Sequence, residues 1–150
     1  MAEKRESKAG VYVDSSALAK LYLPEVESDL VDGFLRGRTD LMFSELSITE
    51  VISAVTRRRR EGALGAGQAN QIRDAVLADA ESGSFRRLDL NPAVHRAAEQ
   101  MLLSSSGLPL RTLDALHIAL AISGAAEQIL TFDDRMAEAA TLQGLQLVQL

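Results

Sequence analysis

Short apolar runs alternate along this chain with longer segments in which apolar residues recur at helical spacing. The runs typical of strands are 11–13, 41–43, 85–90, 128–132 and 145–150. The segments typical of helices are 15–23, 25–35, 45–60, 71–82, 92–106, 113–124 and 133–143. Strands that alternate with helices in this order favour parallel pairing, with helices covering the sheet. The pattern therefore predicts an α/β fold, a three-layer α/β/α sandwich with a central parallel sheet.

Some of these segments carry more specific expectations. The second predicted helix has an apolar face that consists of Val26, Leu30, Val31 and Phe34. The segment 113–124 is apolar almost all round, which predicts a buried helix in which His117 is a packed, hydrogen-bonded core residue rather than a catalytic base. The run 85–90 alternates as an exposed edge strand does. The segment 45–60, in which helical spacing begins at Ile48, and the helix 71–82 flank a glycine-containing turn and predict a helical hairpin.

Composition narrows the function only in part. The 150 residues suffice for one domain, which we assign to 11–150 after a polar tail at 1–10. The chain has no cysteine and only two histidines, which argues against disulfides and a zinc site. The tail lacks the apolar centre of a signal peptide and no run is long enough to span a membrane, so we expect a cytoplasmic protein. The net charge of -5 argues against nucleic-acid binding through the overall field, but it is compatible with a local basic patch.

Four carboxylates lie at or near the junctions between a predicted strand and a helix. They are Asp14, Glu50, Asp114 and Asp133. Asp14 and Asp133 directly follow strand-like runs, Glu50 is expected in the first turn of its helix, and Asp114 opens the buried helix after a loop. Each acid alone is compatible with helix capping, because acids stabilise helix N-termini. The stretches 47–50 and 131–134 also match capping boxes.

Taken together, the four acids favour a metal site over capping. Neighbouring strand ends of a parallel sheet are roughly 5 Å apart, so acids at several ends converge on one small volume. Crowded carboxylates repel one another unless a cation is present. Oxygen ligands without cysteine select a hard ion such as Mg²⁺ or Mn²⁺. Such sites most often catalyse in-line displacement at phosphorus, with a water activated by the ion.

Four segments in this order resemble the motifs of the PIN-domain family: VYVDSSALAKLYLPE, SELSITEVISAVTRR, LRTLDALHIALA and ILTFDDRMAEAA. Within the family the chain is most similar to the VapC-type toxins of type II toxin–antitoxin pairs, over nearly its whole length. The resemblance implies a Mg²⁺- or Mn²⁺-dependent endoribonuclease that hydrolyses RNA phosphodiester bonds with a metal-activated water. It also implies the three-layer sandwich that the pattern predicts independently.

The resemblance assigns roles to the four acids. The first and third motifs supply the main metal ligands, Asp14 and Asp114. The second and fourth motifs supply Glu50 and Asp133, which would complete the site directly or through water. On this basis all four acids are expected to be catalytic.

Neighbouring residues leave alternatives open within this assignment. The small hydroxyl residue of such sites falls on Ser15 or Thr131, where it would orient a water. Asp134 adjoins Asp133, so the fourth acid is either of the two. Glu45 is a second glutamate near the second motif, and it ranks below the motif's own glutamate because we expect it in the preceding loop.

The stretch 57–60 is the only strongly basic run. Its simplest interpretation is a set of cations at a helix C-terminus, which the helix dipole favours. Successive helical residues are about 100° apart, so at most two of the four arginines can face a substrate. They lie roughly 10–15 Å along the helix from Glu50, within reach of phosphates that flank a cleavage point. The candidates for RNA contact are Arg57, Arg58 and Arg111.

The resemblance further implies a homodimer and a cognate antitoxin, both of which would use the apolar surface of residues 18–23 and of helix 25–35. Two other functions stay open. One is a catalytically silent PIN-like protein that binds RNA or a protein partner. The other is a different acid-cluster phosphotransfer enzyme, although the phosphatase signature Asp-x-Asp-x-Thr is absent because Asp14 is followed by Ser15 and Ser16.

Overall fold

The computed structural model describes residues 10–105 and 107–150, so all but one residue of the tail predicted at 1–10 lies outside the described residues. The strands are β1 (Val11–Val13), β2 (Leu41–Ser44), β3 (Arg86–Leu88), β4 (Gln128–Leu130) and β5 (Gln146–Leu147). The helices are α1 (Ser15–Ala19), α2 (Ser28–Leu35), α3 (Glu45–Arg60), α4 (Ala66–Glu81), α5 (Pro92–Ser104), α6 (Thr112–Ser123) and α7 (Asp134–Leu142). Within the described ranges, no helix combines the length and the apolar character needed to cross a membrane.

The strands form one parallel sheet in the order β3-β2-β1-β4-β5. The chain proceeds outward from β1 to β3, and then returns to the other side of β1 to add β4 and β5. The order therefore reverses between β1 and β4, where α/β sheets open a crevice at the carboxyl ends of their strands. The backbone N–H of Asp14 donates to the carbonyl oxygen of Leu130 (3.2 Å), which joins the ends of these two strands.

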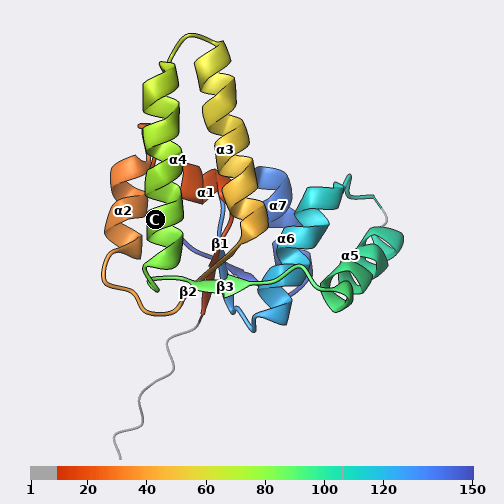
Figure 1. Ribbon diagram of the computed structural model, residues 1–150. Coiled ribbons are helices and arrows are strands. Elements are labelled where there is room, and N and C mark those ends of the chain that lie inside the picture. Colours follow the sequence, from red (N-terminus) through yellow and green to blue (C-terminus); the bar gives the residue numbers. More distant parts are fainter. Residues whose placement is uncertain (1–9, 106) are drawn as a thin grey trace, which may run out of the picture.

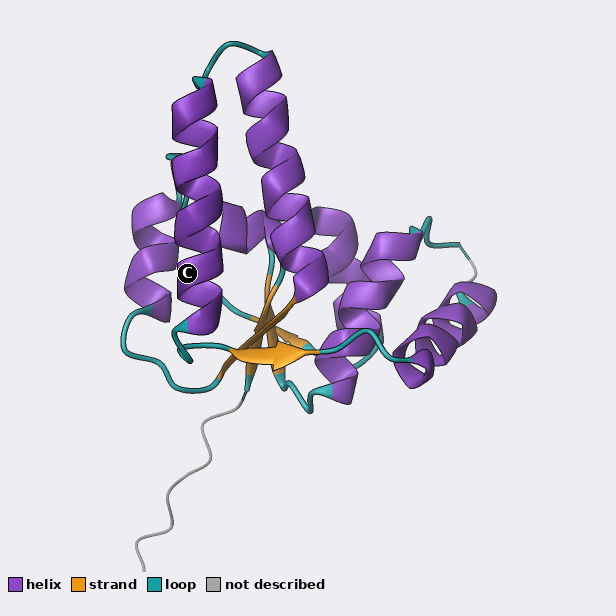
Figure 2. Cartoon of the chain, viewed as in Figure 1, coloured by secondary structure: helices purple, strands orange, loops and turns teal. Residues whose placement is uncertain are grey.

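Helices cover both faces of this sheet, which occupies the centre of the molecule (Figures 1 and 2). Val11 and Val13 of β1 pack in a core with residues of α1, α2, α3 and α4. Tyr12, which points to the opposite face, packs in a second core with residues of α5, α6 and α7. The residues of α6 from Asp114 to Ala121 are all buried, as its apolar sequence predicts. The predicted three-layer α/β/α sandwich is confirmed.

The predicted helical hairpin is formed by α3 and α4, which extend well beyond the sheet (Figure 1). Within it, α4 begins at Ala66, five residues earlier than the sequence pattern indicates. The Gln68 side chain accepts a hydrogen bond from the backbone N–H of Gly65 (2.8 Å) and so stabilises this earlier start. Only Val76 and Ala80 of α4 are buried, so the outer half of the hairpin is solvated on most sides.

The second predicted helix starts later than expected and buries only part of the predicted face. α2 begins at Ser28, whose hydroxyl accepts a hydrogen bond from the backbone N–H of Glu25 (2.9 Å) and fixes a turn ahead of the helix. Val31 is fully buried, but Val26 is 94% and Leu30 is 55% exposed. The predicted apolar face is therefore confirmed for Val31 and for Phe34, which packs against the same core, but it is wrong for Val26 and Leu30.

Candidate active site

Asp14 follows β1 at the reversal point and is 2% exposed. Its Oδ1 accepts hydrogen bonds from the Ser16 hydroxyl (2.7 Å) and from the backbone N–H of Ala17 (3.0 Å), and the second bond caps α1. Its Oδ2 accepts a hydrogen bond from Oγ1 of Thr131 (2.5 Å). Thr131 thus contacts the carboxylate, as does Ser16 in place of the expected Ser15. Asp14 therefore caps α1 and also lies where the strand order reverses.

The burial of Asp14 has an electrostatic consequence. Burial raises the pKa of the Asp14 carboxyl, and the hydrogen bonds from Thr131, Ser16 and Ala17 oppose this rise only in part. The folded protein therefore stabilises the charged carboxylate less well than water does. A cation beside Asp14 would offset this deficit.

Glu50 lies in the second turn of α3, where its carboxylate contacts Nε2 of His117 on α6. The sequence pattern places Glu50 in the first turn, but α3 begins earlier, at Glu45. Ser44 is the N-cap, and its hydroxyl accepts a hydrogen bond from the backbone N–H of Ser47 (3.4 Å). The capping box predicted at 47–50 is therefore wrong, and the Glu50 carboxylate has no capping role.

His117 is 1% exposed, which confirms that it is a packed, hydrogen-bonded core residue. Its Nδ1 lies 2.6 Å from the hydroxyl of Tyr12 on β1. Burial raises the pKa of the Tyr12 phenol and the nearby charges of Asp14 and Glu50 add to this, so the hydroxyl is neutral. Sequence reasoning missed this role of Tyr12, although its alternation with two valines in β1 indicates that it faces the opposite side of the sheet from them.

Asp114 lies in the first turn of α6 and is 7% exposed. Its Oδ2 accepts a hydrogen bond from the backbone N–H of Arg111 (3.2 Å). Since α6 leads into the amino end of β4, its own N-terminus lies at the carboxyl edge of the sheet. Asp114 is therefore at the same edge as Asp14, one helical turn before His117.

Asp133 is exposed at the start of α7, where its carboxylate accepts a hydrogen bond from the backbone N–H of Met136 (3.1 Å). It is the N-cap of α7, so the capping box predicted at 131–134 is wrong. The backbone N–H of Asp133 donates to Oγ1 of Thr131 (3.1 Å), which in turn contacts Asp14. Asp134, also exposed, is the first residue of α7.

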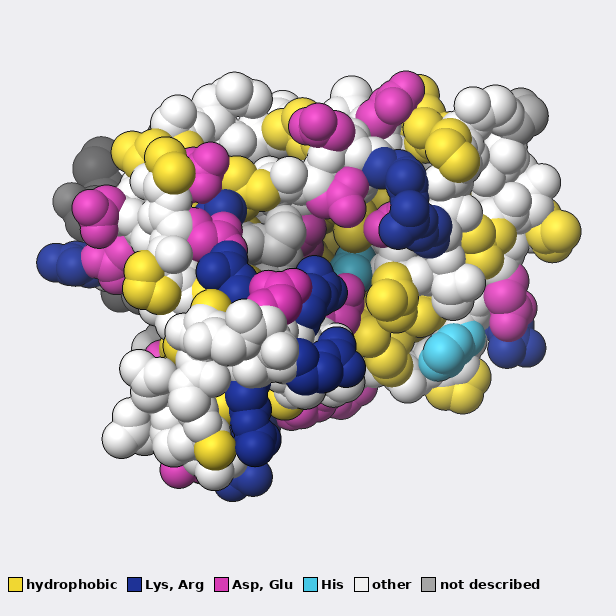
Figure 3. Space-filling view, turned by 90° about the horizontal axis from the view of Figure 1, so that it is seen from above, with side chains coloured by type: hydrophobic (Ala, Val, Ile, Leu, Met, Phe, Trp, Pro, Cys, Tyr) yellow, Lys and Arg dark blue, Asp and Glu magenta, His cyan; other side chains and the backbone are white. Residues whose placement is uncertain are grey.

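The structure thus brings the four acids to one end of the sheet without direct contact among them. Figure 3 looks down on the molecule from above, and acidic and basic side chains gather around a hollow in the middle of this face. Thr131 links Asp14 to Asp133, and His117 binds Glu50. Within residues 10–105 and 107–150, no three His, Cys, Asp or Glu side chains are grouped closely enough to hold a metal ion.

The basic candidates and the second glutamate differ in their surroundings. Arg58 pairs with Glu25 (2.9 Å), whereas Arg57 is exposed and forms no ion pair with a described residue. Arg111 is also exposed, next to the acidic site. Glu45 is the first residue of α3 rather than a loop residue, and it pairs with Arg87 of the edge strand β3 (2.8 Å).

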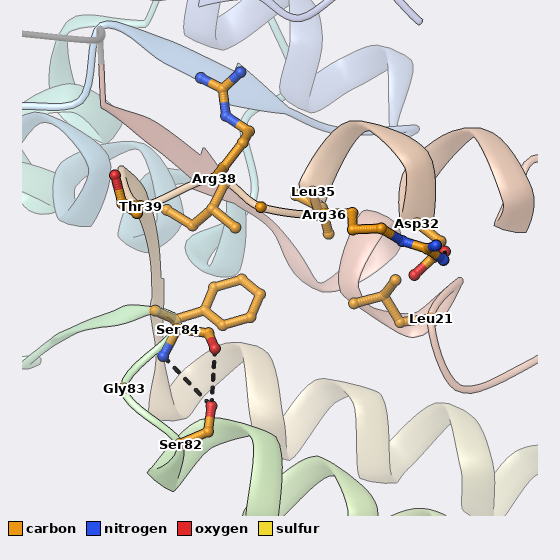
Figure 4. Close-up of a pocket in the computed structure, with 12 residues that line it drawn as sticks. Leu21, Asp32, Leu35, Arg36, Arg38, Thr39, Ser82, Gly83 and Ser84 are labelled. Atoms are coloured by element: carbon orange, nitrogen blue, oxygen red, sulfur yellow. Dashed lines mark hydrogen bonds and ion pairs between the residues drawn. The ribbon is translucent and has the colours of Figure 1, made fainter.

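A cavity of about 500 Å³ lies at the opposite edge of the sheet, between the α2–β2 and α4–β3 connections (Figure 4). Arg36 and Arg38 line it, but Arg36 pairs with Asp32 and Arg38 with Asp40 (2.7 Å). Both guanidinium groups of this lining are neutralised by neighbouring carboxylates. The carboxyl edge, and not this cavity, is therefore the candidate active site.

Comparison with known proteins identifies the family of this chain. The model of the PIN domain matches residues 11–142. Ribonuclease VapC46 of Mycobacterium tuberculosis is 33% identical over 144 residues, which are 93% of this chain and 97% of the relative. Two solved structures share the fold. VapC20 of M. tuberculosis, a sarcin–ricin loop cleaving toxin, has a TM-score of 0.71 at 18% identity and covers 87% of this chain and 95% of its own.

The second structure is VapBC2 of Rickettsia felis, solved bound to a DNA fragment from their promoter. It has a TM-score of 0.64 at 15% identity, and the match covers 92% of this chain and 96% of the other. The family match covers a range that contains all four acids, and the match to VapC46 extends over 93% of the chain. The chain therefore belongs to the PIN-domain family, in its VapC-type branch.

Proposed function

We propose that this protein is a metal-dependent endoribonuclease that hydrolyses RNA phosphodiester bonds as the toxin of a type II toxin–antitoxin pair. The observation that carries the proposal is the buried Asp14 carboxylate at the reversal point of the sheet, held by two hydroxyl groups. Glu50 and Asp114 reach the same edge from α3 and α6. The identity to VapC46, which is named a ribonuclease, supports the reaction class.

The donor set at this edge fits Mg²⁺ or Mn²⁺. Every candidate ligand is a carboxylate oxygen, which hard divalent ions prefer. Mg²⁺ is usually held by one or two carboxylates and keeps several waters, so a group of three direct protein ligands is not required. Asp14 and Asp114, both buried, are the proposed direct ligands, and Glu50 and Asp133 would act directly or through water.

The protein's own groups have separate roles in this reaction. A bound ion would supply an activated water and would offset the negative charge that develops on the phosphate. Thr131 and Ser16 fix the orientation of the Asp14 carboxylate through their hydrogen bonds. The Glu50 carboxylate, anchored at Oε1 by His117, would accept a proton from the attacking water at Oε2.

Contact with the RNA backbone is assigned to exposed arginines. Arg57 lies on α3 beyond Glu50, and Arg111 lies beside Asp114. Arg58 is the weakest of the three candidates, because Glu25 already neutralises it. Guanidinium groups bind phosphate oxygens with two parallel hydrogen bonds, which suits them to hold RNA on either side of a cleavage point.

Protein partners form the second part of the proposal. The likeness to VapBC2 supports an antitoxin, and the exposed Val26 and Leu30 near α2 offer apolar surface for it or for a second copy of this chain. Leu18 and Leu23 are core residues of this chain and contribute little to such a surface. Sedimentation of the isolated protein at micromolar concentration tests the homodimer, and a monomer there would refute it.

Substitution of the buried acids tests the catalytic proposal. Asp14→Ala and Asp114→Ala should each abolish RNA cleavage, while circular dichroism shows a folded protein. Asp74→Ala is the matched control, because Asp74 is an exposed acid on α4 that pairs with Arg73. Full activity in both active-site variants would refute the proposed function.

A catalytically silent protein that binds RNA or a partner is the alternative. Titration of the protein with Mg²⁺ by calorimetry, alongside an RNA cleavage assay, separates the two functions. Heat of binding together with cleavage supports the nuclease. RNA binding without metal uptake or cleavage supports the alternative.

A further inference from the structure

A chain of hydrogen bonds runs through the core beneath Glu50. Nε2 of His117 contacts the Glu50 carboxylate, and Nδ1 of the same ring lies 2.6 Å from the Tyr12 hydroxyl. That hydroxyl lies 3.4 Å from Oγ of Ser44, the N-cap of α3. Tyr12 is 0% and His117 1% exposed, whereas the Glu50 side chain is 26% exposed. Buried polar groups thus lead from the core to a carboxylate at the surface.

With a neutral imidazole, only one direction of donation satisfies the whole chain. A carboxylate only accepts, so the proton on the His117 ring is on Nε2 and is donated to Glu50. Nδ1 then accepts, and the Tyr12 hydroxyl is its donor. The Tyr12 oxygen in turn accepts from the Ser44 hydroxyl. Tyr12 therefore selects the tautomer of His117 that presents a donor to Glu50.

Packing leaves these groups little freedom. Tyr12 comes from β1, His117 from α6 and Glu50 from α3, so the sheet and the helical layers on both of its faces meet in this chain of hydrogen bonds. The Tyr12 and His117 rings pack edge to face with their centroids 5.8 Å apart. A solvated glutamate side chain samples many rotamers, and fixing one of them costs conformational entropy. A rigid donor beneath the carboxylate offsets that cost before substrate arrives.

We propose that Tyr12 and His117 are positioning residues that hold the Glu50 carboxylate in its working orientation at the active site. The proposal rests on the proposed nuclease function for its catalytic consequence. Neither residue touches substrate, since both are buried. Their effect should therefore appear in kcat and in the affinity for Mg²⁺, and not in KM for RNA.

Tyr12→Phe is the most direct test, because it removes only the hydroxyl and keeps the ring in place. We expect kcat to fall on the order of tenfold, the effect of one lost oriented hydrogen bond, with KM unchanged within about twofold. Calorimetric titration of the metal-free variant with Mg²⁺ should show weaker binding than in the unmodified protein. Tyr22→Phe is the matched control, because its hydroxyl donates to Asp79 on the surface (2.8 Å).

His117 provides the second pair of variants. His117→Gln keeps an N–H close to the position of Nε2 and should retain most of the activity and of the Mg²⁺ affinity. His117→Leu keeps the volume but removes the donor, and it should lose at least as much as Tyr12→Phe. Rescue by glutamine separates orientation of Glu50 from simple packing, and it remains informative if one variant fails to fold.

The outcomes distinguish the Tyr12–His117 relay, the pair of positioning residues that orients Glu50, from the nuclease function. If Asp14→Ala abolishes cleavage but Tyr12→Phe equals Tyr22→Phe in kcat and in Mg²⁺ affinity, the relay is refuted and the nuclease stands. If the unmodified protein cleaves no RNA, the nuclease is refuted, and the Mg²⁺ titrations still decide whether Tyr12 and His117 organise the carboxylates. A rise in KM at constant kcat in Tyr12→Phe would also refute the relay.

Discussion

Arg57 and Arg59 lie two residues apart in one basic run, yet helix geometry gives them opposite directions. Arg57 follows Glu50 by seven residues of α3, which brings it within about 20° of the same face at 3.6 residues per turn. Arg59 follows Glu50 by nine residues and lies about 180° away. Both are exposed, and neither pairs with an acid among the described residues. We therefore predict that Arg57→Ala weakens RNA binding and that Arg59→Ala, the matched control, does not.

The size of the effect follows from the position of Arg57. It lies about 10 Å along the helix from Glu50, a distance that suits a phosphate beyond the cleaved bond. One solvated guanidinium–phosphate contact contributes about 1 kcal/mol, so KM should rise about fivefold at low salt with kcat unchanged. A single-strand phosphate contact contributes about 0.7 to the slope of log affinity against log salt. The ratio of the RNA affinity of the unmodified protein to that of Arg57→Ala should therefore shrink about 2.5-fold between about 50 and about 200 mM salt.

The assay needs a cleavable RNA of known sequence. Sequencing of RNA ends after induced expression supplies the cleavage site, and a fluorophore–quencher oligonucleotide that spans it reports kcat and KM. Equal KM values for Arg57→Ala and Arg59→Ala at low salt would refute the assignment of Arg57 to the substrate face. An equal salt slope for Arg57→Ala and the unmodified protein would do the same.

Two further predictions concern stability. Val31→Ala should destabilise the protein by about 2–3 kcal/mol and lower its melting temperature by about 5–10 °C, because Val31 is fully buried. Val26→Ala, at a 94% exposed position before α2, should change stability by less than about 0.5 kcal/mol, and equal losses in the two variants would contradict the placement of Val31 inside the core and of Val26 outside it. Asp14→Asn should raise the melting temperature of the metal-free protein at neutral pH, because it removes a charge that burial disfavours. Since the folded-state pKa of Asp14 lies above the unfolded one, the penalty is complete above the folded pKa and is lost below the unfolded pKa, so this gain should shrink as pH falls. Mg²⁺ should raise the melting temperature of the unmodified protein but not of Asp14→Asn, and an equal rise in both would argue against Asp14 as a ligand.

The sequence predicts the fold well because most elements depend on local periodicity. The apolar run at 11–13 and the all-round apolar segment at 113–124 become β1 and α6 with nearly unchanged bounds. Errors occur where a polar side chain competes for the backbone. Ser28 accepts a hydrogen bond from the chain before α2, and this turn delays the start of the helix by three residues, which hydrophobic spacing alone does not show.

The candidate site was less accessible from the sequence, since its organisation depends on long-range partners. Neighbouring residues are enough to predict that Asp14 follows a strand. Its contact with Thr131, in contrast, joins positions 117 residues apart. The Tyr12–His117 hydrogen bond spans 105 residues. A histidine on an apolar helix indicates a satisfied core residue, as predicted here, but only the strand order shows which tyrosine satisfies it.

The sheet order also explains why the acids occur at different distances from their strands. The crevice lies between β1 and β4, so Asp14, which directly follows β1, and Asp133, three residues after the end of β4, start at its margin. β2 is one strand farther away, by about 4.8 Å, so a side chain that follows it has to reach back across β1. Glu45 lies too early in α3 and pairs with β3 at the sheet edge, whereas Glu50, a turn and a half later, meets His117. The acid that reaches the crevice from the helix after β2 is therefore found in the second turn of α3, and not at the start of the helix where capping residues occur.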